Sequence, residues 1–193
     1  MKNLLLFASG NGTNAENIIR YFHLKKTARV VAVFTNNPKA GVIKRATALQ
    51  VPVEVVSRED FRNPDILIGK IEKWHPDLLV LAGFLWKIPS ELILRYPQRI
   101  INIHPALLPR FGGKGMYGSH VHEAVLAAGE RKSGITIHYV NEKYDDGQII
   151  FQAETEIAPE ETPETLAQKI HQLEYNHFPQ VVEYVLEGNL SKN

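Results

Sequence analysis

Short apolar runs alternate with amphipathic stretches over the first half of the chain, and this alternation limits the fold more than any other feature. Each apolar run is bounded by Gly, Pro or polar residues, as expected for a strand buried on both faces. The stretches between the runs carry apolar residues at helical spacing. Repeated strand–helix units of this kind form a twisted parallel sheet. Strands are predicted over residues 3–8, 29–35, 52–56, 78–82 and 99–104, and helices over residues 15–23, 40–49, 65–74 and 89–94.

The pattern changes after residue 104. Residues 135–140 and 148–157 are strand-like and separated by a turn, which predicts an antiparallel pair added to the sheet. Residues 163–186 predict a long amphipathic helix, broken near Pro179 because proline cannot donate to the preceding turn. A chain of 193 residues suits one domain. The predicted fold over residues 1–193 is a single α/β domain, Rossmann-like, with a mostly parallel twisted sheet, helices on both faces and an antiparallel strand pair near the C-terminal part.

The composition narrows the function. The sequence contains no cysteine, which excludes disulfides, thiolate nucleophiles and iron–sulfur clusters. A net charge of +1 argues against binding to bulk nucleic acid or to an anionic membrane. The apolar run near the N-terminus is too short for a signal peptide or a membrane span. We therefore expect a cytoplasmic protein with small-molecule partners, acting as a monomer or a homodimer.

A glycine-rich turn, Ser9-Gly10-Asn11-Gly12-Thr13-Asn14, joins the first predicted strand to the first predicted helix. Glycine lets the main chain approach a phosphate closely, and the N–H groups at the start of the helix point at the anion. Asn14 is the expected N-cap of this helix. The turn therefore predicts a phosphate site, with a tight strand–helix turn that binds nothing as the alternative.

The residues that follow the glycine-rich turn indicate which class of phosphorylated ligand the site would bind. A dinucleotide site expects an acidic residue about 20 positions further on, where it holds the ribose hydroxyls. No Asp or Glu occurs between Glu16 and Glu54, so NAD is disfavoured. NADP stays open because Lys39, Lys44 and Arg45 lie nearby. A simple phosphomonoester fits better.

Polar side chains end the strand predicted over residues 99–104. Asn102 and His104 are two residues apart, so they share a face at its carboxyl end, where open α/β sheets bind ligands. An Asn amide and a protonated His can both donate to a developing oxyanion. Asp145, in an acidic turn, raises the pKa of His104 if folding brings the two together. The alternatives are backbone capping by Asn102 and His104 and a solvated turn at Asp145.

Other polar residues carry weaker signals. His120 and His122 lack further ligands at metal spacing, so no metal site is expected. His138 lies in an alternating strand, where it faces either the site or solvent. Glu174 lies in the middle of the last helix, where a solvated helix face is the ordinary interpretation.

With these motifs assembled, the chain resembles the folate-dependent formyltransferases from Leu4 to nearly the last helix. The stretch Asn102-Ile103-His104-Pro105-Ala106-Leu107-Leu108-Pro109, followed downstream by Asp145-Asp146-Gly147, carries the resemblance to the family. Leu81-Ala82-Gly83-Phe84 and His120-Val121-His122 add to it. The glycine-rich phosphate loop narrows it to the glycinamide ribonucleotide branch.

The resemblance implies that the formyl group of 10-formyltetrahydrofolate is transferred to the amine of 5-phosphoribosylglycinamide in purine biosynthesis, with no metal. It implies that Asn102 and His104 stabilise a tetrahedral intermediate while Asp145 assists proton transfer. The substrate-binding residues that it implies are Gly12, Thr13, Asn14 and Glu174. The folate-binding residues that it implies are Leu85, Trp86, Lys87, Ile88, Asn102, Glu142 and Asp146.

The chain departs from the family pattern in segments that concern the folate tail and not the reaction. The loop over residues 112–119 looks longer, and Trp86 lies where a basic residue is common. Residues 57–64 look shortened, which leaves Arg58 and Arg62 as candidates for a folate-binding arginine.

Several alternatives remain at this point. A formyl-folate hydrolase would use the same trio with water as the acceptor, but related hydrolases carry an extra N-terminal domain. A transfer-RNA formyltransferase would carry an added C-terminal domain, and a sugar-nucleotide formyltransferase should lack the phosphate loop. A non-catalytic nucleotide-binding module would use the glycine loop alone, without coupling to Asn102.

Overall fold

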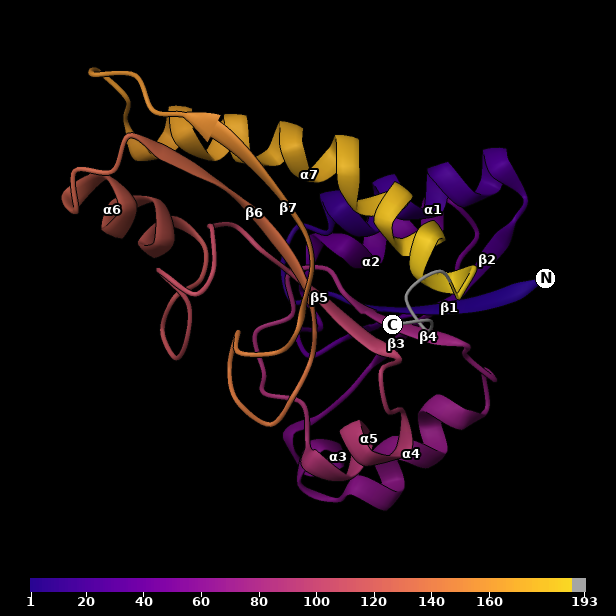
Figure 1. Ribbon diagram of the computed structural model, residues 1–193. Helices are drawn as coiled ribbons and strands as arrows, with labels where there is room; N and C mark the ends of the chain where they lie inside the picture. The colour runs from indigo at the N-terminus through magenta and orange to yellow at the C-terminus, as the bar shows by residue number, and fades with distance from the viewer. Residues whose placement is uncertain (189–193) are drawn as a thin grey trace.

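The computed structural model describes residues 1–188, which fold around one seven-stranded sheet (Figure 1). The strands are β1 (Lys2–Phe7), β2 (Ala28–Thr35), β3 (Val53–Val55), β4 (Leu78–Leu81), β5 (Ile100–His104), β6 (Lys132–Tyr139) and β7 (Ile149–Glu156). They lie in the order β3-β2-β1-β4-β5-β6-β7. Neighbours from β3 to β5 are parallel, whereas β6 is antiparallel to both β5 and β7. The predicted mostly parallel sheet with an antiparallel pair near the C-terminal part is therefore confirmed.

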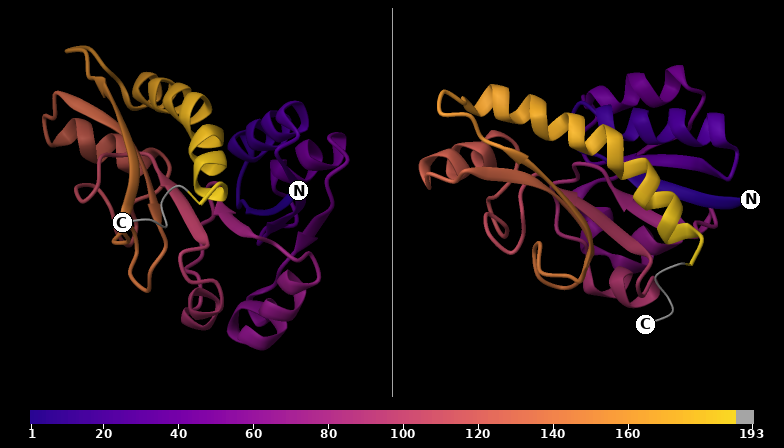
Figure 2. Two further views of the ribbon diagram at one scale, coloured as in Figure 1. Left: turned by 45° about the vertical axis from the view of Figure 1, so that its right-hand side comes forward. Right: turned by 45° about the horizontal axis from the view of Figure 1, so that its top comes forward.

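Helices cover both faces of this sheet (Figure 1, Figure 2). The helices are α1 (Thr13–Lys25), α2 (Gly41–Ala48), α3 (Arg58–Arg62), α4 (Pro64–Glu72), α5 (Ser90–Arg95), α6 (Ser119–Ala127) and α7 (Pro163–Leu186). One layer holds α1, α2, α6 and α7, and the opposite layer holds α3, α4 and α5. The result is the predicted three-layer α/β arrangement.

The alternation of side chains along β1 divides the interior into two cores. Leu4 and Leu6 pack with apolar residues of α1, α2, α6 and α7. Leu5 and Phe7 pack on the other face with residues of α4 and α5. All four side chains are fully buried, as the continuous apolar run predicts for a central strand.

The strand order reverses beside β1. The chain adds β2 and β3 on one side of β1, then returns and adds β4 and β5 on the other. The loops that follow the carboxyl ends of β1 and β4 diverge at this point, where open α/β sheets form their ligand crevice. The topology therefore places the glycine loop after β1 next to the loop after β4.

The structure adds a helix, α3, that was not predicted from the sequence. Residues 57–64, which look shortened relative to the family pattern, contain this helix between β3 and α4. A capping box starts it: the Asp60 N–H donates to Ser57 Oγ at 3.1 Å, and the Ser57 N–H donates to Asp60 Oδ2 at 2.8 Å. Arg58 and Arg62 thereby lie on a helix and not in an irregular loop.

The predicted break near Pro179 is also wrong, because α7 bends but continues through this proline (Figure 1). Proline has no N–H, so the Tyr175 carbonyl loses its ordinary helical donor. Asn17 Nδ2, on α1, donates to that carbonyl at 2.9 Å instead. A side chain from the neighbouring helix thus satisfies the group that proline leaves unpaired.

Within residues 1–188, no helix is both long enough and apolar enough to cross a membrane.

Candidate functional site

The loops that follow β1 and β4 are joined by hydrogen bonds. The Ser9 N–H donates to the Gly83 carbonyl at 3.0 Å, and Ser9 Oγ accepts from the Leu85 N–H at 2.9 Å. Ser9 is itself buried. The glycine loop and the segment of residues 83–88 therefore form one continuous rim at the topological switch point.

Gly12 is the residue on which the shape of the glycine loop depends. Its φ of 77° is left-handed, and it forms the N-cap of α1. A Cβ at this position would lie 2.4 Å from the Cβ of Val42, on α2. Both observations explain why glycine is needed here, and the N–H groups of the first turn of α1, which receive no side-chain cap from Gly12, form a site suited to an anion.

The predicted N-cap role of Asn14 is wrong, because Gly12 holds that position without a side-chain cap. The Asn14 side chain turns toward α7 instead, and its Nδ2 donates to Glu174 Oε2 at 2.8 Å. Asn14 Oδ1 is buried and has no partner within the described part of the chain. The amide thus places a buried acceptor, unpartnered among the described residues, beside the glycine loop.

Glu174 is buried, with 5% of its surface exposed, so the interpretation as a solvated helix face is wrong. Besides Asn14, it contacts His171 Nδ1 at 2.9 Å. The hydrogen bond to Glu174 raises the pKa of His171 above its usual value. The structure therefore brings together Gly12, Thr13, Asn14 and Glu174, the residues expected to hold the phosphorylated substrate.

Asn102, His104 and Asp145 also meet, although they lie far apart in the sequence. Asn102 and His104 extend from β5, and Asp145 comes from the turn between β6 and β7. His104 Nδ1 lies 3.5 Å from Asp145 Oδ2, and Asn102 Nδ2 lies 3.5 Å from Asp145 Oδ1. Their side chains form one polar cluster at the carboxyl end of β5.

The antiparallel strands hold the loop that follows β5. Thr136 Oγ1, on β6, donates to the Ala106 carbonyl at 2.7 Å and accepts from the Leu108 N–H at 3.0 Å. Gln152 Nε2, on β7, donates to the Leu108 carbonyl at 3.0 Å. Thr136 and Gln152 were not predicted as site residues, because their only signal in the sequence is an alternation with apolar neighbours, which marks them as members of one sheet face.

The same loop contacts the polar cluster through its main chain. The Phe111 carbonyl lies 2.7 Å from His104 Nε2, which must donate because a carbonyl only accepts. The Gly113 N–H donates to Asp145 Oδ2 at 2.9 Å. A Cβ at Gly112 would lie 2.4 Å from Leu108 Cδ2 and 3.1 Å from Asp145 Cβ. Glycine at 112 therefore allows the loop to approach Asp145 this closely.

His138 belongs to this cluster, which resolves the orientation that the sequence left open. It lies on β6 directly opposite Asn102 and is 2% exposed. Its Nε2 lies 3.1 Å from Asn102 Nδ2 and 3.6 Å from Asp145 Oδ1. His138 faces the site and not solvent.

The electrostatics of His104 differ from the sequence-based expectation. Burial lowers the pKa of His104, and the nearby Asp145 carboxylate only partly opposes this effect. For Asp145, burial favours the neutral acid, but the neighbouring His138 and His104 rings and the Gly113 N–H together lower the pKa of this carboxyl. The site therefore pairs an ionised Asp145 with a His104 that is neutral at neutral pH.

A groove with a volume of about 270 Å³ opens where the segment after β4 meets α3 and the β6–β7 turn. Arg58 lies 4.9 Å above the ring of Trp86, which also contacts Phe61 edge-on. The groove is lined by Arg58, Phe61, Arg62, Leu85, Trp86, Lys87 and Tyr144. Aromatic rings and cations thus share the wall of one groove beside the polar cluster.

The remaining residues expected to contact the folate are placed differently. Ile88 is buried in the core beneath α4 and α5. Glu142 and Asp146 are exposed in the turn that carries Asp145, and Asp146 Oδ2 accepts from Asn141 Nδ2 at 3.3 Å. Of this turn, Tyr144 is the residue that lines the groove.

The two histidines of α6 do not come together as a metal site. His120 is exposed and lies 3.6 Å from Glu123, whereas His122 is buried and its Nδ1 has no partner within residues 1–188. No group of three or more His, Cys, Asp or Glu residues is arranged to hold a metal ion in the described part of the chain.

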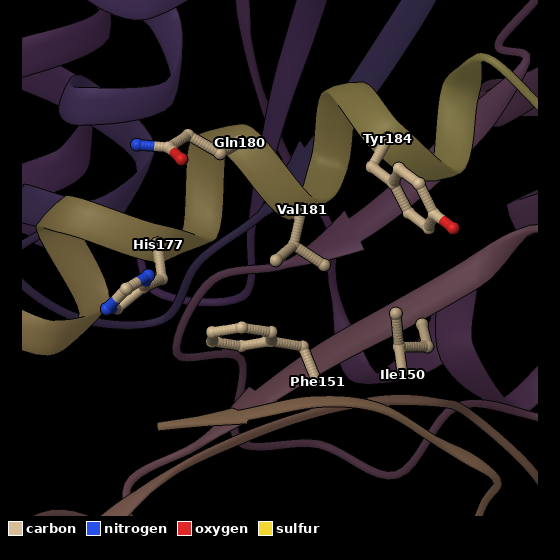
Figure 3. Close-up of a pocket in the computed structure, with 6 residues that line it drawn as sticks. All are labelled: Ile150, Phe151, His177, Gln180, Val181 and Tyr184. Carbon is tan, nitrogen blue, oxygen red and sulfur yellow. The ribbon is translucent and has the colours of Figure 1, made fainter. Parts of the chain in front are cut away.

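A second pocket of about 270 Å³ lies between β7 and the C-terminal half of α7 (Figure 3). Its wall includes the ring of Phe151, which packs on His177 with 5.0 Å between ring centroids. The lining residues are Ile150, Phe151, His177, Gln180, Val181 and Tyr184. None of them is a predicted site residue, so this pocket is separate from the cluster around Asp145.

An NMR titration can test how burial and the Asp145 carboxylate together set the pKa of His104. We expect His104 to titrate below its usual value of about 6.5, because burial disfavours the charged ring. Asp145→Asn should lower the His104 pKa further, since it removes the neighbouring negative charge. His171 is an internal control, because its raised pKa depends on Glu174. A His104 pKa that does not change in Asp145→Asn would contradict the electrostatic role of this carboxylate.

Comparison with known proteins matches the fold and the site motifs to one family. The formyl transferase family model matches residues 2–182. The chain is 40% identical to the chloroplastic phosphoribosylglycinamide formyltransferase of Arabidopsis thaliana, over 98% of this chain and 67% of that protein. It is 36% identical to the phosphoribosylglycinamide formyltransferase of Bacillus subtilis, over 98% of this chain and 97% of that protein.

A solved structure agrees with these matches. The phosphoribosylglycinamide formyltransferase from Bacillus halodurans superposes with a TM-score of 0.87 at 34% identity, covering 96% of this chain and 95% of that chain. Fold, sequence identity and family model therefore agree over nearly the whole described chain. The chain belongs to the formyl transferase family.

Proposed function

We propose that this protein transfers the formyl group of 10-formyltetrahydrofolate to the amine of 5-phosphoribosylglycinamide, a step of purine biosynthesis. The observation that carries the proposal is the meeting of Asn102, His104 and Asp145 between an anion-binding helix start and an aromatic, cationic groove. The start of α1 suits the phosphate of the acceptor, and the groove suits the folate donor. The polar cluster would then lie where the amine of the acceptor meets the formyl group of the donor.

The phosphate of the acceptor fits the start of α1. Gly12, Thr13 and Asn14 present main-chain N–H groups there, and the helix dipole favours an anion. No acidic residue follows β2, where a dinucleotide would need one, so a phosphomonoester is the better match. The Glu174 carboxylate beside Asn14 offers an acceptor for N–H or O–H groups of the same substrate.

The folate donor fits the groove beside α3. A planar ring system and an acidic tail are complementary to the aromatic and cationic residues that line it. Trp86 and Tyr144 offer apolar surface, while Arg58, Arg62 and Lys87 offer positive charge. The departures from the family pattern at residues 57–64 and at Trp86 thus lie together in one wall, where they would define the donor site of this chain.

The proposed chemistry is attack of the acceptor amine on the formyl carbon. As the new C–N bond forms, negative charge develops on the formyl oxygen. Asn102 Nδ2 and His104 Nε2 would donate to that oxygen, which competes with the Phe111 carbonyl for the His104 proton. The bond from the formyl carbon to the folate nitrogen then breaks, and the proton lost by the amine ends on that nitrogen.

Asp145 is suited to move this proton. Its pKa is lowered, so the carboxylate is ionised and able to accept a proton from the amine as the intermediate forms. His104 is neutral in the free protein, because burial lowers its pKa, and still carries the N–H that the oxyanion needs. Passage of the amine proton from Asp145 to the unprotonated His104 Nδ1, 3.5 Å away, would make His104 positive and restore the negative charge of Asp145 beside it.

Three further expectations from the sequence stay predictions: a single formyltransferase domain over residues 1–193, a cytoplasmic location, and a monomeric or homodimeric state.

The activity is tested by following tetrahydrofolate release from 10-formyltetrahydrofolate with and without 5-phosphoribosylglycinamide. We expect release that depends on the acceptor, matched by formylated acceptor. Asn102→Ala and His104→Ala should each lower turnover by about 10²–10³-fold, the usual effect of losing one oxyanion donor. Release without the acceptor would indicate a hydrolase, and near-normal turnover in either folded variant would remove that residue from the reacting centre.

Changes at the proposed phosphate site and at the groove should each raise the Michaelis constant of a different substrate. Thr13→Asp adds negative charge at the start of α1, where acidic residues are tolerated by the helix but repel a phosphate. It should raise KM for 5-phosphoribosylglycinamide by roughly tenfold or more, about 1.4 kcal/mol, and leave the donor KM nearly unchanged. The double variant Arg58→Ala and Lys87→Ala should do the reverse. Equal effects of either change on both constants would contradict the assignment of the two ends.

A further inference from the structure

The polar cluster contains a histidine to which the proposed reaction assigns no task. His138 is almost fully buried, and the pairing of β5 with β6 places it directly opposite Asn102. Its Nε2 lies 3.1 Å from Asn102 Nδ2. Most buried polar atoms have a hydrogen-bond partner, so the contacts of the two His138 ring nitrogens indicate which of them donates and which accepts.

The main chain sets the tautomer of His138. Its Nδ1 lies 2.9 Å from the Tyr139 carbonyl, which accepts but never donates. Nδ1 must therefore carry the proton. In a neutral imidazole the other nitrogen then presents a lone pair, so Nε2 accepts from the Asn102 amide.

This tautomer fixes which way the Asn102 amide points. One Nδ2 hydrogen goes to His138, and the other is directed toward Asp145 Oδ1, at 3.5 Å. That distance is too long for a strong hydrogen bond, so the second N–H stays available to a developing oxyanion. If the amide were reversed, its oxygen would face the His138 lone pair and the Asp145 carboxylate, and both contacts would be repulsive.

The backbone around His138 is arranged to keep this contact. The register between β6 and β7 shifts between Ile137 and His138, a local irregularity that commonly re-aims a side chain next to an active site. A Cβ at Gly147 would lie 1.7 Å from the Tyr139 oxygen, so the absence of a side chain at 147 leaves room for this carbonyl. The group that sets the tautomer is thus packed in place.

We propose that His138 is a positioning residue, which donates from Nδ1 to the Tyr139 carbonyl, accepts at Nε2 from Asn102, and so holds the Asn102 amide with an N–H directed at the reacting oxygen. The inference rests on the proposed formyl transfer for its consequence. It does not give His138 contact with either substrate. His138 acts through Asn102, so its loss should lower turnover and not substrate binding.

A set of three variants separates the Nε2 acceptor from the bulk of the ring. In His138→Gln, the side-chain Oε1 takes about the place of Nε2 and can accept from Asn102. In His138→Asn, the amide reaches only the place of Nδ1, and His138→Leu keeps volume without polar atoms. We expect His138→Leu and His138→Asn to lower kcat on the order of 10- to 100-fold, as when the orienting partner of a functional group is lost, with both KM values nearly unchanged. His138→Gln should recover most of kcat.

A double-mutant cycle tests whether His138 acts through Asn102. If it does, Asn102→Ala with His138→Leu should be no slower than Asn102→Ala alone, because the second change removes support for an amide that is already absent. Additive losses would overturn the proposal. Equal rates for His138→Gln and His138→Asn would overturn it too, and so would wild-type kcat in His138→Leu.

The tautomer is testable in the unaltered protein, independently of any variant. Imidazole ¹⁵N spectra of the wild type should show His138 protonated on Nδ1 and unprotonated on Nε2 at neutral pH, and a proton on Nε2 would overturn the proposal. A wild type without formyl transfer would contradict the proposed function, while this spectrum would still report on the contact between His138 and Asn102. The two proposals can therefore fail separately.

Discussion

Asp145 is a carboxylate held where burial alone would favour its neutral acid. Its side chain is 11% exposed, and its φ of 52° is a left-handed conformation that non-glycine residues rarely adopt. The polar groups around it reverse the effect of burial and lower its pKa. Each of those groups comes from a different segment: β5, β6 and the loop after β5. The position of this one charge therefore depends on the packing of all three, and they in turn are oriented by it.

The sheet topology explains how these segments meet. The parallel strands β1 and β4 place the glycine loop and the segment of residues 83–88 at the switch point, where they form the proposed phosphate end and one wall of the groove. The strand β6 runs antiparallel to β5, so His138 lies opposite Asn102, and the turn between β6 and β7 returns Asp145 to β5. The proposed substrate-binding ends thus belong mainly to the parallel half of the sheet, while β6 and the β6–β7 turn complete the polar cluster of the proposed reacting centre.

The sequence predicted the parts of this structure that depend on local patterns. Continuous apolar runs identify the central strands because both faces are buried, and the glycine loop is identifiable because glycine suits both the left-handed φ at Gly12 and its close approach to Val42. The helix α3 was missed because five residues carry too little periodicity, although Ser57 and Asp60 hold a capping signal. The continuation of α7 through Pro179 depends on a donor from α1, which no pattern within α7 reveals.

The parts of the site that the sequence could not supply depend on contacts between distant segments. The burial of Glu174 follows from the packing of α7 on α1, and the orientation of His138 follows from its register with β5. The His104 pKa was expected to be raised because Asp145 was considered without the cost of burial, which the structure shows to be the larger effect. A resemblance can indicate that His104 and Asp145 lie close together. The direction of the pKa shift also depends on how deeply each group is buried, which only the structure shows.

The central claim is that the charge of Asp145, and not only its shape, sustains the reacting centre. The most direct test is the single-turnover rate of formyl transfer by Asp145→Asn at saturating substrates, because asparagine keeps the size of the side chain and removes its charge. The account predicts a rate lowered by about 10²-fold or more, as for the loss of a general acid–base group, with unchanged binding of 5-phosphoribosylglycinamide at the distant start of α1. A folded Asp145→Asn protein that transfers the formyl group at the wild-type rate would contradict it.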